Sequence, residues 1–182
     1  MMLSDLTGKN ICILGFGREG RAMLKAIQDA GIECSITIAD QKSEIQSTKH
    51  EAVSDFGFSA SNLQWHSGNS YLKHLDRFDV IIRSPGIFPC SELEAVQNRI
   101  TNSTQIFLDE VTSKNATVIG VTGSKGKSTT ASLIYGILKA GGKNVTLVGN
   151  IGEPAIGHVK DASANKYFVQ EMSSYQLMNM ES

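Results

Sequence analysis

Short apolar runs separated by a helical repeat characterise the first forty residues. Residues 10–14 (NICIL) and 34–39 (CSITIA) are apolar and rich in β-branched side chains, as strands usually are. Between them, apolar residues recur at helical intervals from Ala22 to Ala30, and Gly31 ends the pattern. This order predicts a β-strand, a helix and a second β-strand, which is how an α/β fold begins.

The alternation continues with weaker signals to about residue 116. We expect strands at 63–66, 79–82 and 105–108, a helix at 92–100 and a polar linker at 112–116. Residues 42–61 are polar and poorly patterned, with a weak helical signal at 47–56. These elements predict a first domain over residues 1–110, which is an ordinary domain size.

A second series of strands and helices follows. We expect strands at 118–121, 144–148 and 167–170, a helix that ends at Gly141 and Gly142, and a short helix that begins at Pro154. Three parallel strands with helices on one face would leave much apolar surface uncovered. We therefore expect residues 111–182 to be the incomplete beginning of a second domain.

A glycine-rich turn follows the first predicted strand. Gly15, Gly17 and Gly20 have the G-x-G-x-x-G spacing, and Asp40 ends the second strand. A glycine turn between strand and helix, with an acid at the end of the next strand, is typical of dinucleotide-binding units. NAD is the default ligand of such a unit, but the same crevice can hold another nucleotide diphosphate.

The strand at 79–82 runs into a second candidate turn, Ser84-Pro85-Gly86. Open α/β sheets bind ligands at the carboxyl ends of their strands, which is where this turn lies. A plain tight turn has the same residue types. Local chemistry alone leaves both interpretations open.

The sequence from 117 to 130 (TVIGVTGSKGKSTT) has the order of a phosphate-binding loop: strand, glycine loop, helix. Its glycines let backbone N–H groups converge on an anion, and the helix start adds partial positive charge. In such a loop Lys127 reaches the β- and γ-phosphates and the Ser128 hydroxyl holds Mg²⁺. Val121 stands where the usual spelling has a first glycine. The alternative is a Gly/Ser turn with a solvated lysine pair, which the flanking strand and helix signals disfavour.

Glu171 ends the last predicted strand. Carboxylates at strand ends often bind the Mg²⁺ of a bound nucleotide. Taken alone, Glu171 fits an ordinary exposed acid better.

Composition narrows the function classes. The 182 residues are 41% hydrophobic and 19% charged, with a net charge of −1, so no basic surface for nucleic acid or membranes is indicated. No signal peptide or membrane-length apolar run is visible, and the scattered Cys12, Cys34 and Cys90 fit reduced thiols. We expect a cytoplasmic protein. Its four histidines have no metal-ligand spacing.

Several motifs, in this order, resemble those of the Mur ligase family. Residues 123–129 (GSKGKST) are similar to the family's ATP loop, T-G-[ST]-x-G-K-[ST], whose pattern also accounts for Val121. Residues 149–152 (GNIG) and 171–177 (EMSSYQL) resemble the family's G-N-I-G and E-x-S-S-[FY]-Q-L segments. The amino-terminal glycine turn and residues 84–87 (SPGI) point to the D-glutamate-adding member.

The resemblance implies an α/β fold in which a Rossmann-like domain for a UDP-substrate, 1–110, precedes a truncated P-loop NTPase-like central domain, 111–182. It implies an ATP-dependent ligase that adds D-glutamate to UDP-N-acetylmuramoyl-L-alanine through an acyl phosphate, in peptidoglycan precursor synthesis. ATP and Mg²⁺ are the implied cofactors. The family's reactive lysine, histidine and third domain would lie beyond Ser182, so we expect a fragment that does not complete the reaction alone.

By resemblance, each motif carries a set of roles. Lys127 and Glu171 are the implied catalytic residues, and Ser128 and Glu171 the metal ligands. ATP would be bound by Gly123, Ser124, Lys125, Gly126, Lys127, Ser128 and Thr129. The UDP-substrate would be bound by Phe16, Arg18, Asp40, Gln41, Lys42, Ser84, Gly86 and Asn150, with Glu19 a further candidate. Ser173, Ser174 and Gln176 would line the central site. Gln41-Lys42 departs from the Thr-Arg that family members often carry, although Lys42 can still meet a phosphate as a point charge.

Two rival functions remain open. One keeps the fold and changes the substrate: another Mur ligase or a folylpolyglutamate synthase. The other is a NAD-binding regulatory module, which rests on the glycine spacing and Asp40 but explains neither the phosphate loop nor residues 171–174.

Overall fold

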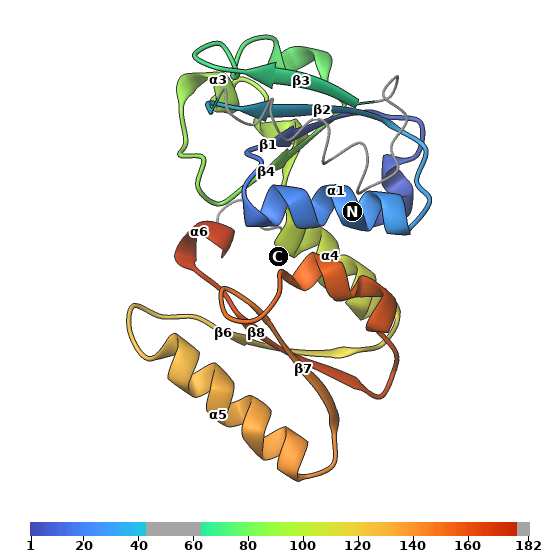
Figure 1. Cartoon of the computed structure of the whole chain (residues 1–182), viewed down its shortest axis with the longest axis vertical. Coiled ribbons are helices and arrows are strands. Elements are labelled where there is room, and N and C mark those ends of the chain that lie inside the picture. Colours follow the sequence, from blue (N-terminus) through green and yellow to red (C-terminus); the bar gives the residue numbers. More distant parts are fainter. Residues whose placement is uncertain (43–62, 178–182) are drawn as a thin grey trace. The chain divides into compact units, whose positions relative to one another are not determined.

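The computed structural model describes residues 1–42 and 63–177 (Figure 1). The chain divides into two compact units, one formed by Leu3–Ser103 and the other by Thr104–Ser182 together with Met1–Met2. The predicted division after residue 110 falls inside a helix that begins at Ser103, and it stays a prediction. Within the part of the chain that the structure describes, no helix combines the length and hydropathy that a membrane span needs.

The Leu3–Ser103 unit contains a parallel five-stranded sheet with the strand order β3-β2-β1-β4-β5. Its strands are β1 (Asn10–Leu14), β2 (Ser35–Asp40), β3 (Leu63–Ser67), β4 (Val80–Arg83) and β5 (Ile100–Thr101). Its helices are α1 (Arg18–Asp29) and α3 (Ser91–Glu94), with 3-10 turns η1 (Leu3–Leu6), η3 (Leu75–Arg77) and η4 (Gln97–Arg99). The predicted Rossmann-like start, strand, helix, strand, is confirmed.

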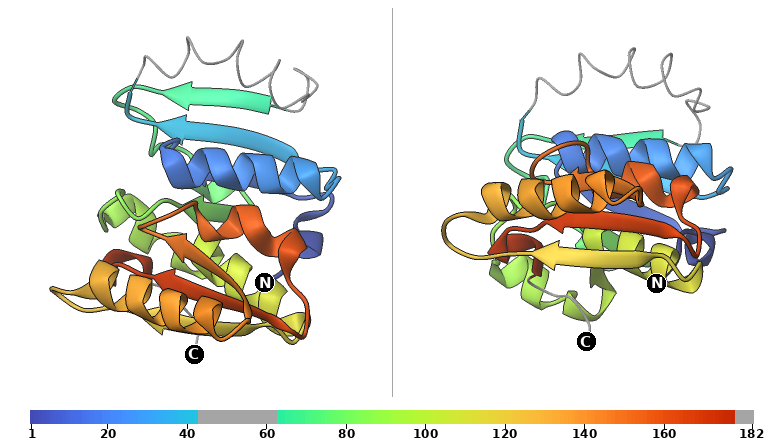
Figure 2. Two further views of the ribbon diagram at one scale, coloured as in Figure 1. Left: turned by 60° about the horizontal axis from the view of Figure 1, so that its bottom comes forward. Right: turned by 90° about the horizontal axis from the view of Figure 1, so that it is seen from below.

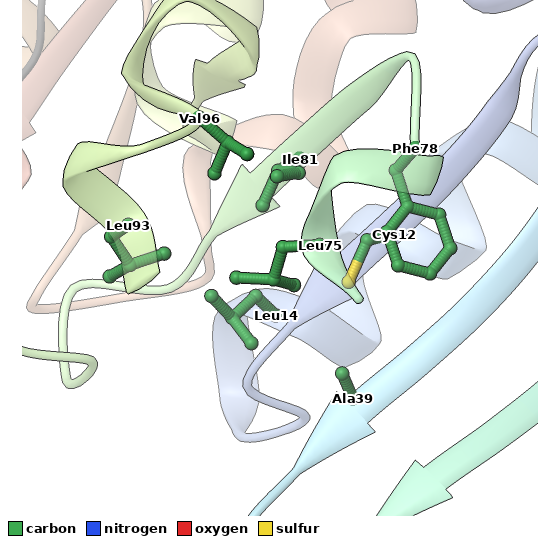
Figure 3. Close-up of a cluster of buried hydrophobic side chains, with 8 residues drawn as sticks. All are labelled: Cys12, Leu14, Ala39, Leu75, Phe78, Ile81, Leu93 and Val96. Carbon is green, nitrogen blue, oxygen red and sulfur yellow. The ribbon is translucent and has the colours of Figure 1, made fainter. Parts of the chain in front are cut away.

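Both faces of this sheet are buried. Side chains alternate along a strand, so Ile13 faces α1 while its neighbours Cys12 and Leu14 face the opposite side. There they join a cluster of buried side chains shown in Figure 3: Cys12, Leu14, Ala39, Leu75, Phe78, Ile81, Leu93 and Val96. Burial raises the pKa of the Cys12 thiol to about 12, so Cys12 is a packing residue rather than a reactive thiol.

The second unit contains a parallel three-stranded sheet with the order β6-β8-β7. Its elements are α4 (Ser103–Ser113), β6 (Thr117–Val121), α5 (Lys127–Ala140), β7 (Asn144–Gly149), η5 (Ala155–Asp161), β8 (Lys166–Glu171) and α6 (Ser174–Leu177). α5 runs along one face of the sheet (Figures 1 and 2), where Ala131 packs with Val121 and Val169. Phe168 points to the other face and meets Phe107 of α4 edge-on, with 5.2 Å between ring centroids. The three predicted parallel strands are confirmed.

Two predicted elements are wrong. Residues 105–108 lie in helix α4, not in a strand: three adjacent apolar residues suggested β-structure, but Phe107 and Val111 are buried one helical turn apart. Of the predicted helix 92–100, only the residues up to Glu94 lie in helix α3; Gln97–Arg99 form a 3-10 turn, and Ile100 pairs with Ile81 as the start of strand β5. The predicted linker 112–116 is partly helical, because α4 continues to Ser113. The helical signal at 47–56 lies outside the described residues.

We predict that Gly20→Ala destabilises the protein even though alanine favours helices. A Cβ at position 20 would lie 2.2 Å from the backbone oxygen of Gly15, which cannot move without displacing the turn. The loss in unfolding free energy should be about 2 kcal/mol or more, measured by urea denaturation and circular dichroism. Gly136→Ala in α5 is the matched control: its Cβ would meet nothing within 4 Å, and it should be neutral or stabilising by up to about 1 kcal/mol. Equal effects at the two positions would contradict this account.

Candidate functional site

In the sheet of the Leu3–Ser103 unit, the order in which the chain adds strands reverses between β1 and β4. From β1 the chain builds outward through β2 to β3, and from β4 it builds the other way to β5. The connections after β1 and β4 therefore leave on opposite faces, and in open α/β sheets this arrangement places a ligand crevice at the carboxyl ends of these strands. The two sequence motifs of this half, the glycine turn and the Ser84 turn, follow these two strands.

A side-chain hydrogen bond joins the two turns. The Ser84 hydroxyl donates to the Gly15 carbonyl over 2.8 Å, and Ser84 N–H donates to the Leu14 carbonyl over 2.8 Å. Gly15 has φ +89°, and a Cβ there would lie 2.9 Å from Ser84 Cβ. Ile87 N–H closes a tight turn on the Ser84 carbonyl, and Gly86 is exposed with open space around it. Thus the Ser84 segment is a tight turn and also one wall of the crevice.

Asp40 holds the glycine turn to the end of β2. Its Oδ2 accepts a hydrogen bond from Phe16 N–H (2.7 Å), and its Oδ1 accepts one from Lys42 N–H (2.8 Å). Hydrogen bonds to an ionised carboxylate are stronger than those between two neutral groups. Asp40 is therefore a structural residue of the crevice first, with lone pairs left over for a ligand.

The other predicted UDP-site residues of this unit differ in how far their side chains are exposed to a ligand. The Phe16 side chain is buried, packed edge-on against Trp65 with 5.3 Å between centroids, so a ligand can meet only its backbone. The Glu19 carboxylate accepts a hydrogen bond from the Ser103 hydroxyl (2.7 Å). The side chains on the outer rim of the crevice are exposed: Arg18, Gln41 and Lys42.

In the second unit, the glycine loop has two features that favour anion binding: glycines with positive φ and a helix start. Gly123 and Gly126 have φ values of +146° and +77°, and Gly126 is the residue before the first turn of α5. The first amides of a helix have no partner within it, so the start of α5 presents N–H groups and partial positive charge. The Lys127 ammonium folds back and donates to the Gly123 carbonyl over 2.8 Å. The predicted phosphate-loop residues thus form one loop and helix start, and all of them except Lys127 are exposed.

Glu171 is buried, which contradicts the interpretation as an exposed acid. Its side chain is only 4% exposed, and Oε2 is enclosed without a hydrogen-bond partner in the described part of the chain. Glu171 lies two residues after Val169, so both side chains are on the same face of the sheet. Val169 packs on α5, and the Glu171 carboxylate therefore points to the α5 side. An enclosed, unpaired carboxylate oxygen suits a hard cation such as Mg²⁺. The exposed Ser128 lies in the first turn of α5, which packs on that side of the sheet.

Asn150 is held next to Glu171 by its backbone. Gly149 has φ +104°, and a Cβ there would lie 2.2 Å from the Glu171 carbonyl oxygen. Asn150 N–H donates to that same oxygen over 3.1 Å, which leaves the Asn150 side chain exposed. Only glycine at position 149 allows this approach.

Ser173 and Gln176 contact each other. The Gln176 side-chain oxygen accepts from Ser173 N–H (2.8 Å), and Gln176 N–H donates to the Ser173 hydroxyl (3.3 Å). This reciprocal pair caps the start of α6. Gln176 is 2% exposed, so the pair shapes the turn after Glu171, while Ser174 is exposed.

Sequence reasoning passed over Arg83, the last residue of β4. It is only 6% exposed and lies immediately before Ser84, beside Leu14 of β1. An arginine that ends an apolar strand next to a Ser-Pro-Gly turn was the available signal.

Comparisons with known proteins found a family profile that matches each half of the chain. The Mur ligase middle domain profile matches residues 121–182, and the NADPH-binding domain profile of acetohydroxy acid isomeroreductase matches residues 5–62. The UDP-N-acetylmuramoylalanine–D-glutamate ligase of Clostridium acetobutylicum is 33% identical over 97% of this chain. The UDP-N-acetylmuramoyl-L-alanine–L-glutamate ligase of Salinispora tropica is 35% identical over 99% of it. The chain spans only 37% and 38% of the length of these two relatives.

Among solved structures, a UDP-N-acetylmuramate:L-alanyl-gamma-D-glutamyl-meso-diaminopimelate ligase from Neisseria meningitides aligns over 90% of this chain and 52% of its own. The sequence identity is 19% and the TM-score is 0.47.

We predict that Asp40→Ala lowers the unfolding free energy of the first unit by about 1–3 kcal/mol, because two backbone N–H groups lose a charged acceptor. Trp65, the one tryptophan of the sequence, packs on Phe16 and reports this unfolding by its fluorescence. Asp76→Ala, at an exposed position of the same unit, is the control and should change stability by less than about 0.5 kcal/mol. If Asp40→Ala were as stable as the control, the carboxylate would not hold the turn.

Proposed function

Because this chain belongs to the Mur ligase family, we propose that it carries the nucleotide-sugar site and the ATP-phosphate loop of a ligase that joins D-glutamate to UDP-N-acetylmuramoyl-L-alanine. The observation that carries the proposal is the second unit. There a left-handed glycine loop, a lysine and a buried unpaired carboxylate lie at the carboxyl ends of parallel strands. A phosphoryl-transfer site needs these groups, and a binding module for NAD alone does not.

In this proposal, ATP transfers its γ-phosphoryl group to the substrate carboxylate and leaves as ADP. The glutamate amine then attacks the acyl phosphate, forms the amide bond and displaces phosphate. The amides of the glycine loop and the start of α5 would hold the phosphate oxygens. Lys127 would leave the Gly123 carbonyl and place its ammonium on the β- and γ-phosphates. Charge placed where it develops in the transition state is the main contribution such a site makes to rate.

Ser128 and Glu171 are the residues that would hold Mg²⁺. A bound Mg²⁺ would neutralise charge on the transferred phosphoryl group. The buried Glu171 carboxylate supports this role, because without a cation it has an oxygen that nothing in the described residues satisfies.

The crevice of the first unit would hold the UDP part of the substrate. Ser84, Asp40 and the glycine turn form a preorganised wall, and Lys42 and Arg18 supply exposed positive charge at its rim. Asn150, whose side chain is exposed in the second unit, stays a proposed contact of the UDP-substrate. A NADPH-type ligand is the competing occupant, given the profile match to a NADPH-binding domain.

L-Glutamate is the second candidate for the amino acid. A relative named for L-glutamate is as similar to this chain as one named for D-glutamate. The test is turnover by the protein with the family's full length, given ATP, UDP-N-acetylmuramoyl-L-alanine and either enantiomer, with phosphate release and mass spectrometry as readouts. We expect ligation of D-glutamate; ligation of L-glutamate alone would assign the second function, and release of no phosphate with either would refute both.

We predict that Lys127→Ala weakens ATP binding by the 182-residue chain at least tenfold, since one ammonium no longer meets the phosphates. Isothermal titration calorimetry with ATP and Mg²⁺ measures the effect. Lys139→Ala, near the end of the same helix and bonded to the Tyr135 hydroxyl, removes the same charge and should bind ATP like the unmodified chain. Equal affinities for both variants would argue against the phosphate loop.

A further inference from the structure

Arg83 is a buried cation that the proposed function does not use. Its Cα pairs with Leu14 and, two residues earlier, Ile81 pairs with Cys12. Alternation along the strand therefore sends the Arg83 side chain out on the face of the cluster in Figure 3, at the carboxyl end of β4. It lies beside the crevice, one residue before the serine that joins the two turns.

Within the described part of the chain, the charge of Arg83 has no partner. Across residues 1–42 and 63–177, no carboxylate forms an ion pair with it and no acceptor takes a hydrogen bond from it. The enclosed polar atoms that lack partners belong to other residues, His66, Gln170 and Glu171, so the guanidinium nitrogens are not sealed in the core. The Arg83 side chain is thus mostly buried, and its guanidinium nitrogens keep only a small contact with solvent.

An unpaired buried cation is costly. Removing a charge from water without a counter-ion costs several kcal/mol, which folded proteins avoid by pairing it. Burial lowers the pKa of Arg83, and the opposing effect of the nearby Cys90 is smaller. Arginine nevertheless stays protonated, so the chain without ligand holds an uncompensated positive charge here.

The groups around Arg83 leave this charge free for a ligand. Both oxygens of Asp40, at the end of β2, already accept backbone N–H groups. The half-buried phenol of Tyr71 has its pKa raised by burial first and then by the nearby Cys90 and Asp40. Cys90 affects both Tyr71 and Arg83, while no carboxylate is among the groups that shift the pKa of Arg83.

We propose that the Arg83 guanidinium binds the diphosphate of the nucleotide sugar in this crevice. A guanidinium presents paired N–H donors that match phosphate oxygens, and it is less strongly hydrated than an ammonium. Lys42, exposed at the rim, would supply a second, solvated charge. The inference rests on the proposed UDP-substrate site and adds the residue that reads its anionic part.

The experiment is calorimetric titration of the 182-residue chain with UDP, uridine and inorganic pyrophosphate. Arg83→Gln should bind UDP and pyrophosphate at least tenfold more weakly and bind uridine within twofold of the unmodified chain. Arg83→Lys should recover part of the loss. Arg77→Gln is the matched control, because Arg77 stacks on Phe78 at the opposite end of β4, and its variant should bind all three ligands normally.

Thermal unfolding without ligand gives an independent readout. Arg83→Gln should melt at the same temperature as the unmodified chain or higher, since an unpaired charge is removed. If Arg83 were a structural cation, the variant would melt lower and its affinity for uridine would fall together with that for UDP, which would overturn the proposal.

The remaining outcomes separate this inference from the proposed function. Unchanged UDP affinity in Arg83→Gln overturns the inference and leaves the UDP site standing. Binding of pyrophosphate that depends on Arg83, with no gain from the uridine moiety, supports the inference and counts against the UDP site. No saturable binding of UDP or pyrophosphate by the unmodified chain overturns the inference.

Discussion

Contact of backbone with backbone, possible only where a side chain is missing, shapes both candidate sites. Gly20 lies against the Gly15 carbonyl in the first unit, and Gly149 lies against the Glu171 carbonyl in the second. Each contact fixes a helix or a loop to the carboxyl end of a parallel strand. The polar groups that end these strands are therefore held at one edge of each sheet, where a nucleotide can reach them.

Each unit also holds a buried charge at that edge. Glu171 in the second unit and Arg83 in the first are both more than nine-tenths buried, and neither has an ion-pair partner in the described residues. Opposite charges suit opposite ligands: a carboxylate attracts a metal cation, and a guanidinium attracts a phosphate. Such charges lower the stability of the unliganded protein, a cost that binding sites often carry.

The strands and both glycine motifs could be predicted because their signals are local. Apolar runs of five or six residues and glycines at fixed spacing depend on little beyond the segment itself. Helix α4 was missed because three adjacent apolar residues resemble a strand when the packing of Phe107 on Phe168 is unknown.

The roles of individual side chains depend more on distant contacts. Phe16 follows the glycine turn, but its ring turns inward onto Trp65, which lies on a strand some fifty residues later. Asp40 was found by its position, while its two backbone partners come from different turns. Arg83 is buried although its residue type is usually exposed, so composition alone did not reveal it.

The Lys127–Gly123 hydrogen bond has a consequence for selectivity. In the loop without ligand, the Lys127 ammonium donates a hydrogen bond to the Gly123 carbonyl. An incoming anion must replace this carbonyl as the acceptor. The lysine has already lost much of its rotational freedom, and the exchange is one of acceptors rather than the ordering of a loose chain. A weakly charged anion binds the ammonium little more strongly than the carbonyl does, whereas a polyphosphate binds it much more strongly. The loop therefore favours ligands of high negative charge density.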